Sequence, residues 1–219
     1  MYWNKISLLS LLLFFLQLSF YNDKKPKVLI IGDSISIGYT PFVQEYFAQR
    51  ATIIHNEGNA QHTRTGLLNI ENWLGNESWD VIQFNWGLWD LCYRHPDSKE
   101  QGNRDKIKGK IEFTLQEYES NLDSIVSILK KKTKAKLIFV TTTYVPKNEA
   151  GRFENDPEKY NEIAKKIMKK YSIPVNDIYK PSILIHETFG EGSDNVHYKK
   201  EGYEKLSKLI IAFLEPILK

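Results

Sequence analysis

Short apolar runs alternate along the chain with longer segments of helical periodicity. The first run, residues 28–31, is apolar at every position, which is typical of a parallel strand buried on both faces. The segment that follows carries large apolar residues at helical spacing as far as Arg50. The alternation continues to the end of the chain, with further strands expected at 52–55, 81–84, 137–141 and 173–175, and helices at 67–74, 115–129, 157–170, 181–187 and 202–218. Strands that alternate with helices predict an α/β fold, with a parallel sheet between two helical layers.

Two helix starts carry additional local signals. Thr40 followed by Pro41 is typical of a helix cap and the first helical residue. Thr114, three residues before Glu117, predicts a capping box.

The highly charged segment 94–110 contains proline and glycine and predicts a loop, either a lid over a site or a merely solvated connection.

Length and charge limit the classes of function. The chain has 219 residues, of which 42% are hydrophobic, and this suits one globular domain with a sizeable core. A formal net charge of +3 does not indicate a nucleic-acid partner. Cys92 is the one cysteine, so an internal disulfide is excluded, and its thiol is expected to pack in the structure and not to act as a nucleophile.

The N-terminal residues predict export. Residues 6–20 are almost entirely apolar, which fits a signal-peptide core and is short for a membrane span. A clear small-x-small cleavage site is missing, so residues 1–20 are either a signal peptide or an uncleaved anchor, and only the anchor would bring the protein to a membrane. Residues 21–26 read as a linker into a domain that spans 27–219. The expected location is periplasmic, cell-surface or extracellular.

A candidate nucleophile follows the first strand. Gly32 allows a tight turn, and Ser34 then lies outside the carboxyl end of a strand, where α/β folds place their chemistry. Taken alone, this stretch is better explained by Asp33 or Ser34 capping the next helix. Near the other end of the chain, Asp194 precedes His197 by three residues, a spacing that stacks both side chains on one face of a helical turn. A carboxylate that orients an imidazole lets it accept a serine proton, so Ser34, His197 and Asp194 form a candidate catalytic set.

Together these motifs resemble those of the SGNH, or GDSL-type, hydrolases. The resemblance rests on residues 32–34 (Gly-Asp-Ser), on Asp194-x-x-His197 and on residues 80–91, which are similar to the family's third block. It covers nearly all of the chain from Lys27 onward. It implies a three-layer α/β/α, flavodoxin-like fold with a central five-stranded parallel sheet, and it implies neither a metal nor an organic cofactor.

The third block departs from the family pattern Gly-x-Asn-Asp. Gly87 and Asp90 match, but Trp89 stands where the family has an asparagine that donates to the oxyanion. The block is similar to that of a subgroup with the pattern Asn-Trp-Gly-Leu-His-Asp, with Trp89 in place of the histidine. Two residues can compensate for the lost donor, namely Asn85 through its amide and Trp89 through its indole N–H.

The resemblance also implies backbone donors and a substrate surface. The N–H groups of Ser34 and Gly58 are expected to line the oxyanion hole, although the register at Gly58 can slip by a residue or two, and an ordinary loop glycine is an equal alternative. Asn59 is expected beside the substrate. Aromatic rings near the rim suit a sugar substrate, with packing in the core as the alternative; these are Trp86, Trp89, Tyr93 and Tyr144.

The function expected from these features is that of an exported serine esterase. Its partner would be a small-molecule or polysaccharide ester, and O-acetyl groups on carbohydrate fit best with export and the aromatic residues. One alternative is a lysophospholipase or thioesterase of the same fold. The other is a non-catalytic glycan-binding relative that lost its oxyanion hole at Trp89. The oligomeric state stays open.

Overall fold

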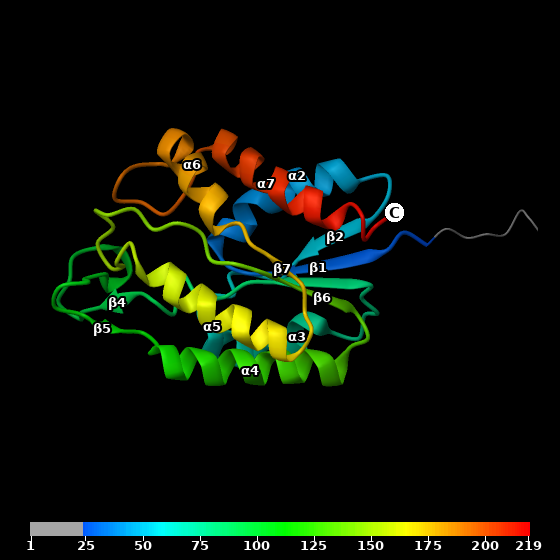
Figure 1. Ribbon diagram of the computed structural model, residues 1–219, viewed down its shortest axis with the longest axis horizontal. Coiled ribbons are helices and arrows are strands. Elements are labelled where there is room, and N and C mark those ends of the chain that lie inside the picture. Colours follow the sequence, from blue (N-terminus) through cyan, green and yellow to red (C-terminus); the bar gives the residue numbers. More distant parts are fainter. Residues whose placement is uncertain (1–23) are drawn as a thin grey trace, which may run out of the picture.

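A five-stranded parallel sheet forms the centre of the molecule (Figure 1). The computed structural model describes residues 24–219, so the predicted signal peptide or anchor lies outside the described residues. The strand order is β2-β1-β3-β6-β7, with bounds β1 Lys27–Ile31, β2 Thr52–His55, β3 Val81–Phe84, β6 Lys136–Val140 and β7 Val175–Asn176. The predicted α/β fold with five parallel strands is therefore confirmed.

The strand order places a switch point between β1 and β3. The connection after β1 leads to β2 on one side, whereas the connection after β3 leads to β6 on the other, so the two connections run in opposite directions from this pair of strands. Ligands of open α/β sheets bind outside the carboxyl ends of the strands at such a point. The residues that follow β1 and β3 include Ser34 and Asn85, so both belong to this edge of the sheet.

The core lies on both faces of the sheet. The four apolar residues of the first predicted strand, 28–31, are all buried, as expected for a central parallel strand. In the register of the sheet, Phe84 lies beside both Ile31 and Phe139, and the rings of Phe84 and Phe139 pack edge to face.

Three helices cover each face of the sheet (Figure 1). On one face lie α2 (Ser34–Phe47), α6 (Tyr179–Phe189) and α7 (Lys200–Leu214), and on the other α3 (Thr63–Leu74), α4 (Leu115–Lys132) and α5 (Asp156–Lys170). The predicted capping box of α4 is confirmed, because Thr114 Oγ1 accepts from Glu117 N and Glu117 Oε2 accepts from Thr114 N. Within residues 24–219, no helix is both long and apolar enough to cross a bilayer.

The predicted start of α2 at Thr40 and Pro41 is wrong. The helix begins at Ser34, because Asp33 provides the N-cap and its Oδ1 accepts a hydrogen bond from Ile35 N at 2.9 Å. Pro41 lies inside the helix, where it removes one backbone hydrogen bond. Thr40 caps nothing, since its hydroxyl donates back to Ser36 O at 2.7 Å.

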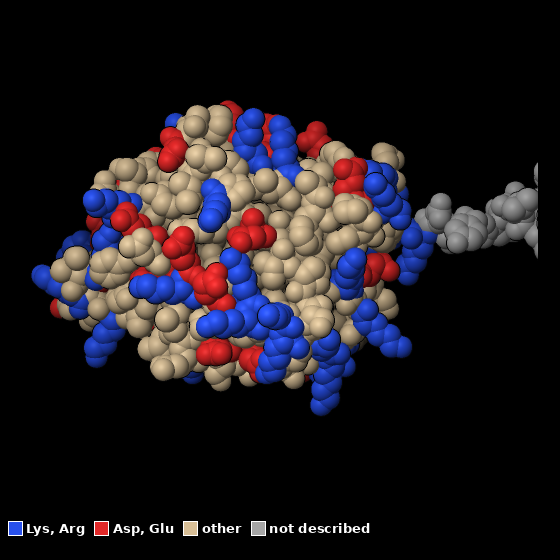
Figure 2. Space-filling view, viewed as in Figure 1, with Lys and Arg blue, Asp and Glu red and all other residues tan. Residues whose placement is uncertain are grey.

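The charged segment 94–110 is tied to the loop that follows β6. The short strands β4 (Tyr93–Arg94) and β5 (Lys110–Ile111) pair antiparallel, and a 3₁₀ turn, η2 (Gln101–Asn103), lies between them. Tyr93 N donates to Gly151 O, and Lys106 N donates to Ala150 O, both at 2.7 Å. Figure 2 shows basic and acidic side chains interspersed over the visible face of the molecule, in keeping with the small net charge.

Candidate active site

The turn after β1 presents Ser34 at the start of a helix. Gly32 is required here because a Cβ atom would lie 2.6 Å from Ser36 Oγ. Asp33 is buried, and this burial raises the pKa of its carboxyl, whereas the hydrogen bond from Ile35 N opposes the rise. Ser34 is half-buried and is the first residue of α2, where backbone N–H groups have no partner inside the helix.

Ser34 contacts His197, as the sequence motifs predict. The distance from Ser34 Oγ to His197 Nε2 is 2.9 Å, although 163 residues separate the two in the chain. Burial lowers the pKa of His197 below its ordinary value of 6.5; the negative charge of Glu191 opposes this, and the positive charge of Arg152 adds to it. The imidazole is therefore neutral at pH 7 and can accept the serine proton.

The other nitrogen of His197 contacts Asn195, and the predicted pairing with Asp194 is not found in the described part of the chain. Asn195 Oδ1 lies 2.7 Å from His197 Nδ1 and also accepts from His197 N at 3.0 Å. Asp194 is exposed. The expectation assumed a helical turn, but residues 194–197 lie in a non-helical loop before α7, so the spacing of three does not bring the two side chains to one face.

Asn195 is itself held from two sides. Its amide Nδ2 donates to Glu191 Oε2 at 2.9 Å, and its backbone carbonyl lies 2.7 Å from His186 Nε2. The ring of His186 packs edge to face against Tyr144 and Tyr198. Because an amide oxygen can only accept, Asn195 fixes the proton of His197 on Nδ1 and leaves Nε2 bare toward Ser34. Sequence reasoning missed Asn195, and the only available signal was its place two residues before the histidine.

The loop with Gly58 lies against the nucleophile turn. Asn56 Oδ1 accepts from Gly32 N, and Ala60 N donates to Gly32 O, each at 3.0 Å. Gly58 has a φ of +70°, a conformation that favours glycine, and is open to solvent. Asn59 is half-buried, and its Oδ1 accepts from Gln61 N at 2.8 Å. Gly58 and Asn59 thus lie on a loop that is hydrogen-bonded to Gly32. The roles of Gly58 in the oxyanion hole and of Asn59 beside the substrate stay predictions.

Asn85 and Trp89, the two side chains expected to replace the family asparagine, both make other contacts. Asn85 Nδ2 donates to Val140 O at 2.8 Å, which uses one of its two N–H bonds. Trp89 is half-buried, and the guanidinium of Arg94 lies 5.1 Å from the centre of its ring. The backbone between them has a tight approach at Gly87, where φ is +143° and a Cβ would clash with Thr142 Oγ1.

The predicted rim aromatic residues divide into two groups. Trp86 is 1% exposed, its indole N–H donates to Ala60 O, and its ring stacks on Trp73, so its predicted contact with substrate is wrong and it packs in the core. Tyr93 and Tyr144 are half-buried. Tyr93 packs edge to face on Phe153. Contact of Tyr93 and Tyr144 with a substrate stays a prediction.

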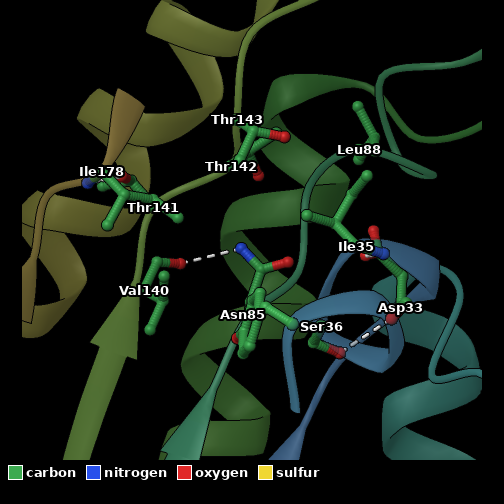
Figure 3. A pocket seen from close by; sticks show the side chains of 11 residues that line it. Asp33, Ile35, Ser36, Asn85, Leu88, Val140, Thr141, Thr142, Thr143 and Ile178 are labelled. Atoms are coloured by element: carbon green, nitrogen blue, oxygen red, sulfur yellow. Dashed lines mark hydrogen bonds between the residues drawn. The ribbon is translucent and has the colours of Figure 1, made fainter. Parts of the chain in front are cut away.

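A small cavity lies directly under the nucleophile turn (Figure 3). Its volume is about 10 Å³, room for about one water molecule or a methyl group. Asp33 and Ile35, the two neighbours of Ser34, line it together with Asn85 and Leu88. Figure 3 shows Asn85 between these side chains and the β6 exit, with the dashed bond to Val140 O. Larger hollows of about 730 and 590 Å³ lie elsewhere, the first beside Lys24 and Lys219 and the second beside Gly75.

Comparison with known proteins supports the same fold. Similar solved structures include a lipase/acylhydrolase from Enterococcus faecalis (20% identity, TM-score 0.70, covering 89% of this chain and 97% of that one). An acetyl xylan esterase, AlAXEase, matches at 17% identity and a TM-score of 0.67, covering 86% of this chain and 99% of that one. The acetylxylan esterase Axe2 from Geobacillus stearothermophilus matches at 18% identity and a TM-score of 0.65, covering 85% and 93%. These identities establish the fold alone.

The search among curated proteins finds no match. The sequence profile of the GDSL-like lipase/acylhydrolase family, in contrast, matches residues 28–210, which is most of the chain and includes Ser34 and His197. The contact between these two side chains lies at the carboxyl edge of the fold that the solved structures share. The chain therefore belongs to the GDSL-like lipase/acylhydrolase family.

Proposed function

We propose that this protein is an exported serine esterase that removes O-acetyl groups from carbohydrate. The contact that carries the proposal is the one of 2.9 Å between Ser34 Oγ and His197 Nε2, with the imidazole held by Asn195. A serine, a neutral histidine and a group that orients the histidine are the parts that acyl transfer through an acyl-enzyme needs.

In the proposed mechanism, Ser34 attacks the ester carbonyl while His197 takes the hydroxyl proton. His197 then returns this proton to the leaving alcohol, and an acyl-enzyme remains on Ser34. Water, deprotonated by the same imidazole, releases the acid. The backbone N–H groups of Ser34 and Gly58 bind the tetrahedral oxyanion, with Asn85 or Trp89 as the side-chain donor expected from the sequence. Asn195 takes the orienting role that the motif assigned to Asp194.

The acetyl group is favoured by the size of the small cavity under the nucleophile turn, which is lined by both neighbours of Ser34 but not by Ser34 itself. A volume of about 10 Å³ fits a methyl group and excludes a long acyl chain. Two of the similar solved structures are described as acetyl xylan esterases, which supports carbohydrate as the alcohol. Another is described as a lipase/acylhydrolase, so a lipid or thioester hydrolase is the rival of the same mechanism. Export rests on the apolar N-terminal residues 6–20.

The test is Ser34→Ala, with Ser36→Ala as the matched control. Ser36 also contacts a histidine, with Oγ 2.7 Å from His55 Nε2, and it lines the same small cavity, so Ser36→Ala tests whether this second serine is the nucleophile. We expect a fluorophosphonate probe to label the wild type and Ser36→Ala but not Ser34→Ala, and acetate release from acetylated polysaccharides to follow the labelling. Labelling that survives Ser34→Ala would move the nucleophile. Binding of glycans without turnover would instead support the non-catalytic relative.

A further inference from the structure

Trp89 stands where the family pattern has its asparagine donor, and Asn85 already uses one N–H on Val140 O, so a third candidate donor beside these two bears on the oxyanion hole. Losing one such donor typically lowers turnover by about 10²–10³. The turn that carries Trp89 has a second polar neighbour that the sequence motifs do not include. This neighbour is Arg152, which belongs to the loop between β6 and α5.

Arg152 is fixed against the turn of the third block. Its Nε donates to Leu88 O at 2.6 Å, and Leu88 is the residue directly before Trp89. One terminal nitrogen, Nη1, donates to Glu149 Oε1 at 2.8 Å. Within residues 24–219, the other terminal nitrogen makes no hydrogen bond. The side chain is 6% exposed, so a guanidinium with unused N–H bonds is held in one orientation beside the site.

The charges around Arg152 do not balance. Glu149 is fully buried and pairs with both Arg152 and Arg104, so two guanidinium groups share one carboxylate. Glu149 Oε2 is already used, because it accepts from Gly151 N at 2.7 Å. Arg104 is partly exposed, and water screens its charge, whereas Arg152 is not screened in this way. The buried carboxyl of Asp33 also interacts with the charge of Arg152, but burial raises the pKa of Asp33, so it is a weaker counter-charge than Glu149. A buried cation of this kind suits a place where a negative charge develops during the reaction.

The charge of Arg152 reaches both sides of the nucleophile. It lowers the pKa of Asp33, the residue before Ser34, in opposition to the larger effect of burial. It also lowers the pKa of His197, which contacts Ser34 directly. Leu88, the carbonyl partner of Arg152, lines the same small cavity as Asp33 and Ile35. Through Leu88, the residue directly before Trp89, the guanidinium is therefore bonded to the turn that lines this cavity.

We propose that Arg152 is the side-chain donor of the oxyanion hole and replaces the asparagine that Trp89 has displaced. The proposal rests on the proposed esterase function. The guanidinium donates a hydrogen bond and its positive charge to the tetrahedral oxygen and keeps all of its protons, so the proton transfers remain those of Ser34 and His197. Preorganised donors of this kind act at the transition state and contribute little to the binding of the ground state.

The experiment measures kcat and KM for p-nitrophenyl acetate, a small neutral ester, in Arg152→Gln, Arg152→Lys and the matched control Arg104→Gln. The control removes the other guanidinium on Glu149 but has no contact with Leu88. We expect Arg152→Gln to lose about 10²–10³ in kcat with KM nearly unchanged. Arg152→Lys keeps a cation beside Glu149 and should recover part of the loss, whereas Arg104→Gln should stay within a few-fold of wild type. Thermal unfolding of each variant identifies losses that come from misfolding.

A second readout does not depend on turnover. Methylboronic acid forms a tetrahedral adduct with a serine hydroxyl, and its affinity should fall in Arg152→Gln by a factor similar to that in kcat. Equal losses in Arg104→Gln, or unchanged kcat in both Arg152 variants, would overturn the proposal. A rise in KM confined to carboxylate-bearing esters would also overturn it, because Arg152 would then bind the substrate's anion. If wild-type turnover does not depend on Ser34, the esterase function itself fails, and this outcome is separate from a failure at Arg152 alone.

Discussion

At the scale of single residues, the reaction depends on whether His197 is neutral. Burial lowers the pKa of His197 below 6.5, and a base is active only when it is unprotonated. We therefore expect kcat/KM to rise with pH along a single limb whose midpoint lies below 6.5, and to be level at pH 7–8. The limb should be absent in His197→Ala, together with most of the rate. A midpoint above 7 in the wild type would mean that another group is the base.

The partner of the imidazole gives a second prediction at this scale. Asn195→Ala removes the acceptor 2.7 Å from His197 Nδ1, so kcat should fall strongly, on the order of 10²-fold or more, through loss of the correct tautomer. Asp194→Ala is the matched comparison, because Asp194 is the adjacent residue and is exposed; it should keep most of the rate. Turnover measured in both variants, with unfolding curves as a check, decides between them. The reverse pattern would restore the carboxylate to the orienting role.

The structure agrees with some of the site residues predicted from the sequence and not with others, and the physical reason differs from one residue to the next. Ser34 and His197 carry a specific pair of motifs at distant positions, and the structure brings them into contact. The pairing with Asp194 depended on an assumed helical turn, and the conformation of a loop cannot be derived from spacing alone. Trp86 was expected at the rim because it follows a strand, but its ring turns inward onto Trp73. Arg152 has no motif and gains its place only through the folded path of its loop.

At the scale of elements, Asp90 joins the turn after β3 to the start of α3. Its Oδ1 accepts from both the N–H and the hydroxyl of Thr63, the first residue of α3, while Oδ2 has no partner within the described residues. Burial raises the pKa of Asp90 to about 7, and the hydrogen bonds from Thr63 oppose this rise. The fold therefore favours the neutral acid, because the cost of burying the charged carboxylate exceeds what the two hydrogen bonds from Thr63 return on ionisation.

This link predicts a dependence of stability on pH. The folded pKa of about 7 is above the ordinary pKa of 3.8 for this side chain, so the contribution of Asp90 to stability is complete below pH 3.8 and is lost as pH rises toward 7. The loss is about 1.4 kcal/mol per pH unit between the two values. Asp90→Asn keeps the oxygen that accepts from Thr63 and should remove this slope. Urea unfolding at pH 5, 6 and 7 measures it, with the exposed Asp97→Asn as control, and parallel slopes in wild type and Asp90→Asn would contradict the assignment.

The sequence predicts the presence of each main helix and strand more directly than the residues at which it begins and ends. The first four strands of the sheet lie within about one residue of the apolar runs that predict them, because a run buried on both faces leaves few alternatives, whereas β7 begins at Val175, where the predicted fifth strand ends. The start of α2 was misplaced because two signals compete, and the cap at Asp33 prevails over the proline at position 41. The small β4–β5 pair was not predicted, because strands of two residues are too short to show an apolar pattern; Tyr93 of β4 bonds to the backbone of Gly151, and Lys106 in the connecting loop bonds to that of Ala150.

At the scale of the whole molecule, three loops meet at the carboxyl edge of the sheet. The segment 93–112 is bonded to the loop 145–153, and this loop is bonded in turn to the segment that precedes His197, through Asn148 N and Ser193 O at 3.2 Å. Sequence patterns predict the sheet but not these loop contacts, because none of them involves an apolar period or a motif. The site therefore combines motif residues on a predictable scaffold with neighbours that only the assembled loops provide.

The size of the space at this edge predicts the acyl group that the enzyme prefers. We expect the acyl group to enter the cavity of about 10 Å³ that both neighbours of Ser34 line, so kcat/KM for p-nitrophenyl acetate should exceed that for the octanoate by at least about 10-fold. Leu88→Val trims the lining of the cavity and should reduce this preference for acetate, whereas Leu184→Ala, which alters an exposed side chain, should leave it unchanged. A series of acetyl, butyryl and octanoyl esters measured in all three proteins gives the ratio. If the wild type hydrolyses the octanoate as well as the acetate, the acyl chain does not occupy this cavity, and the lipid or thioester hydrolase becomes the better assignment.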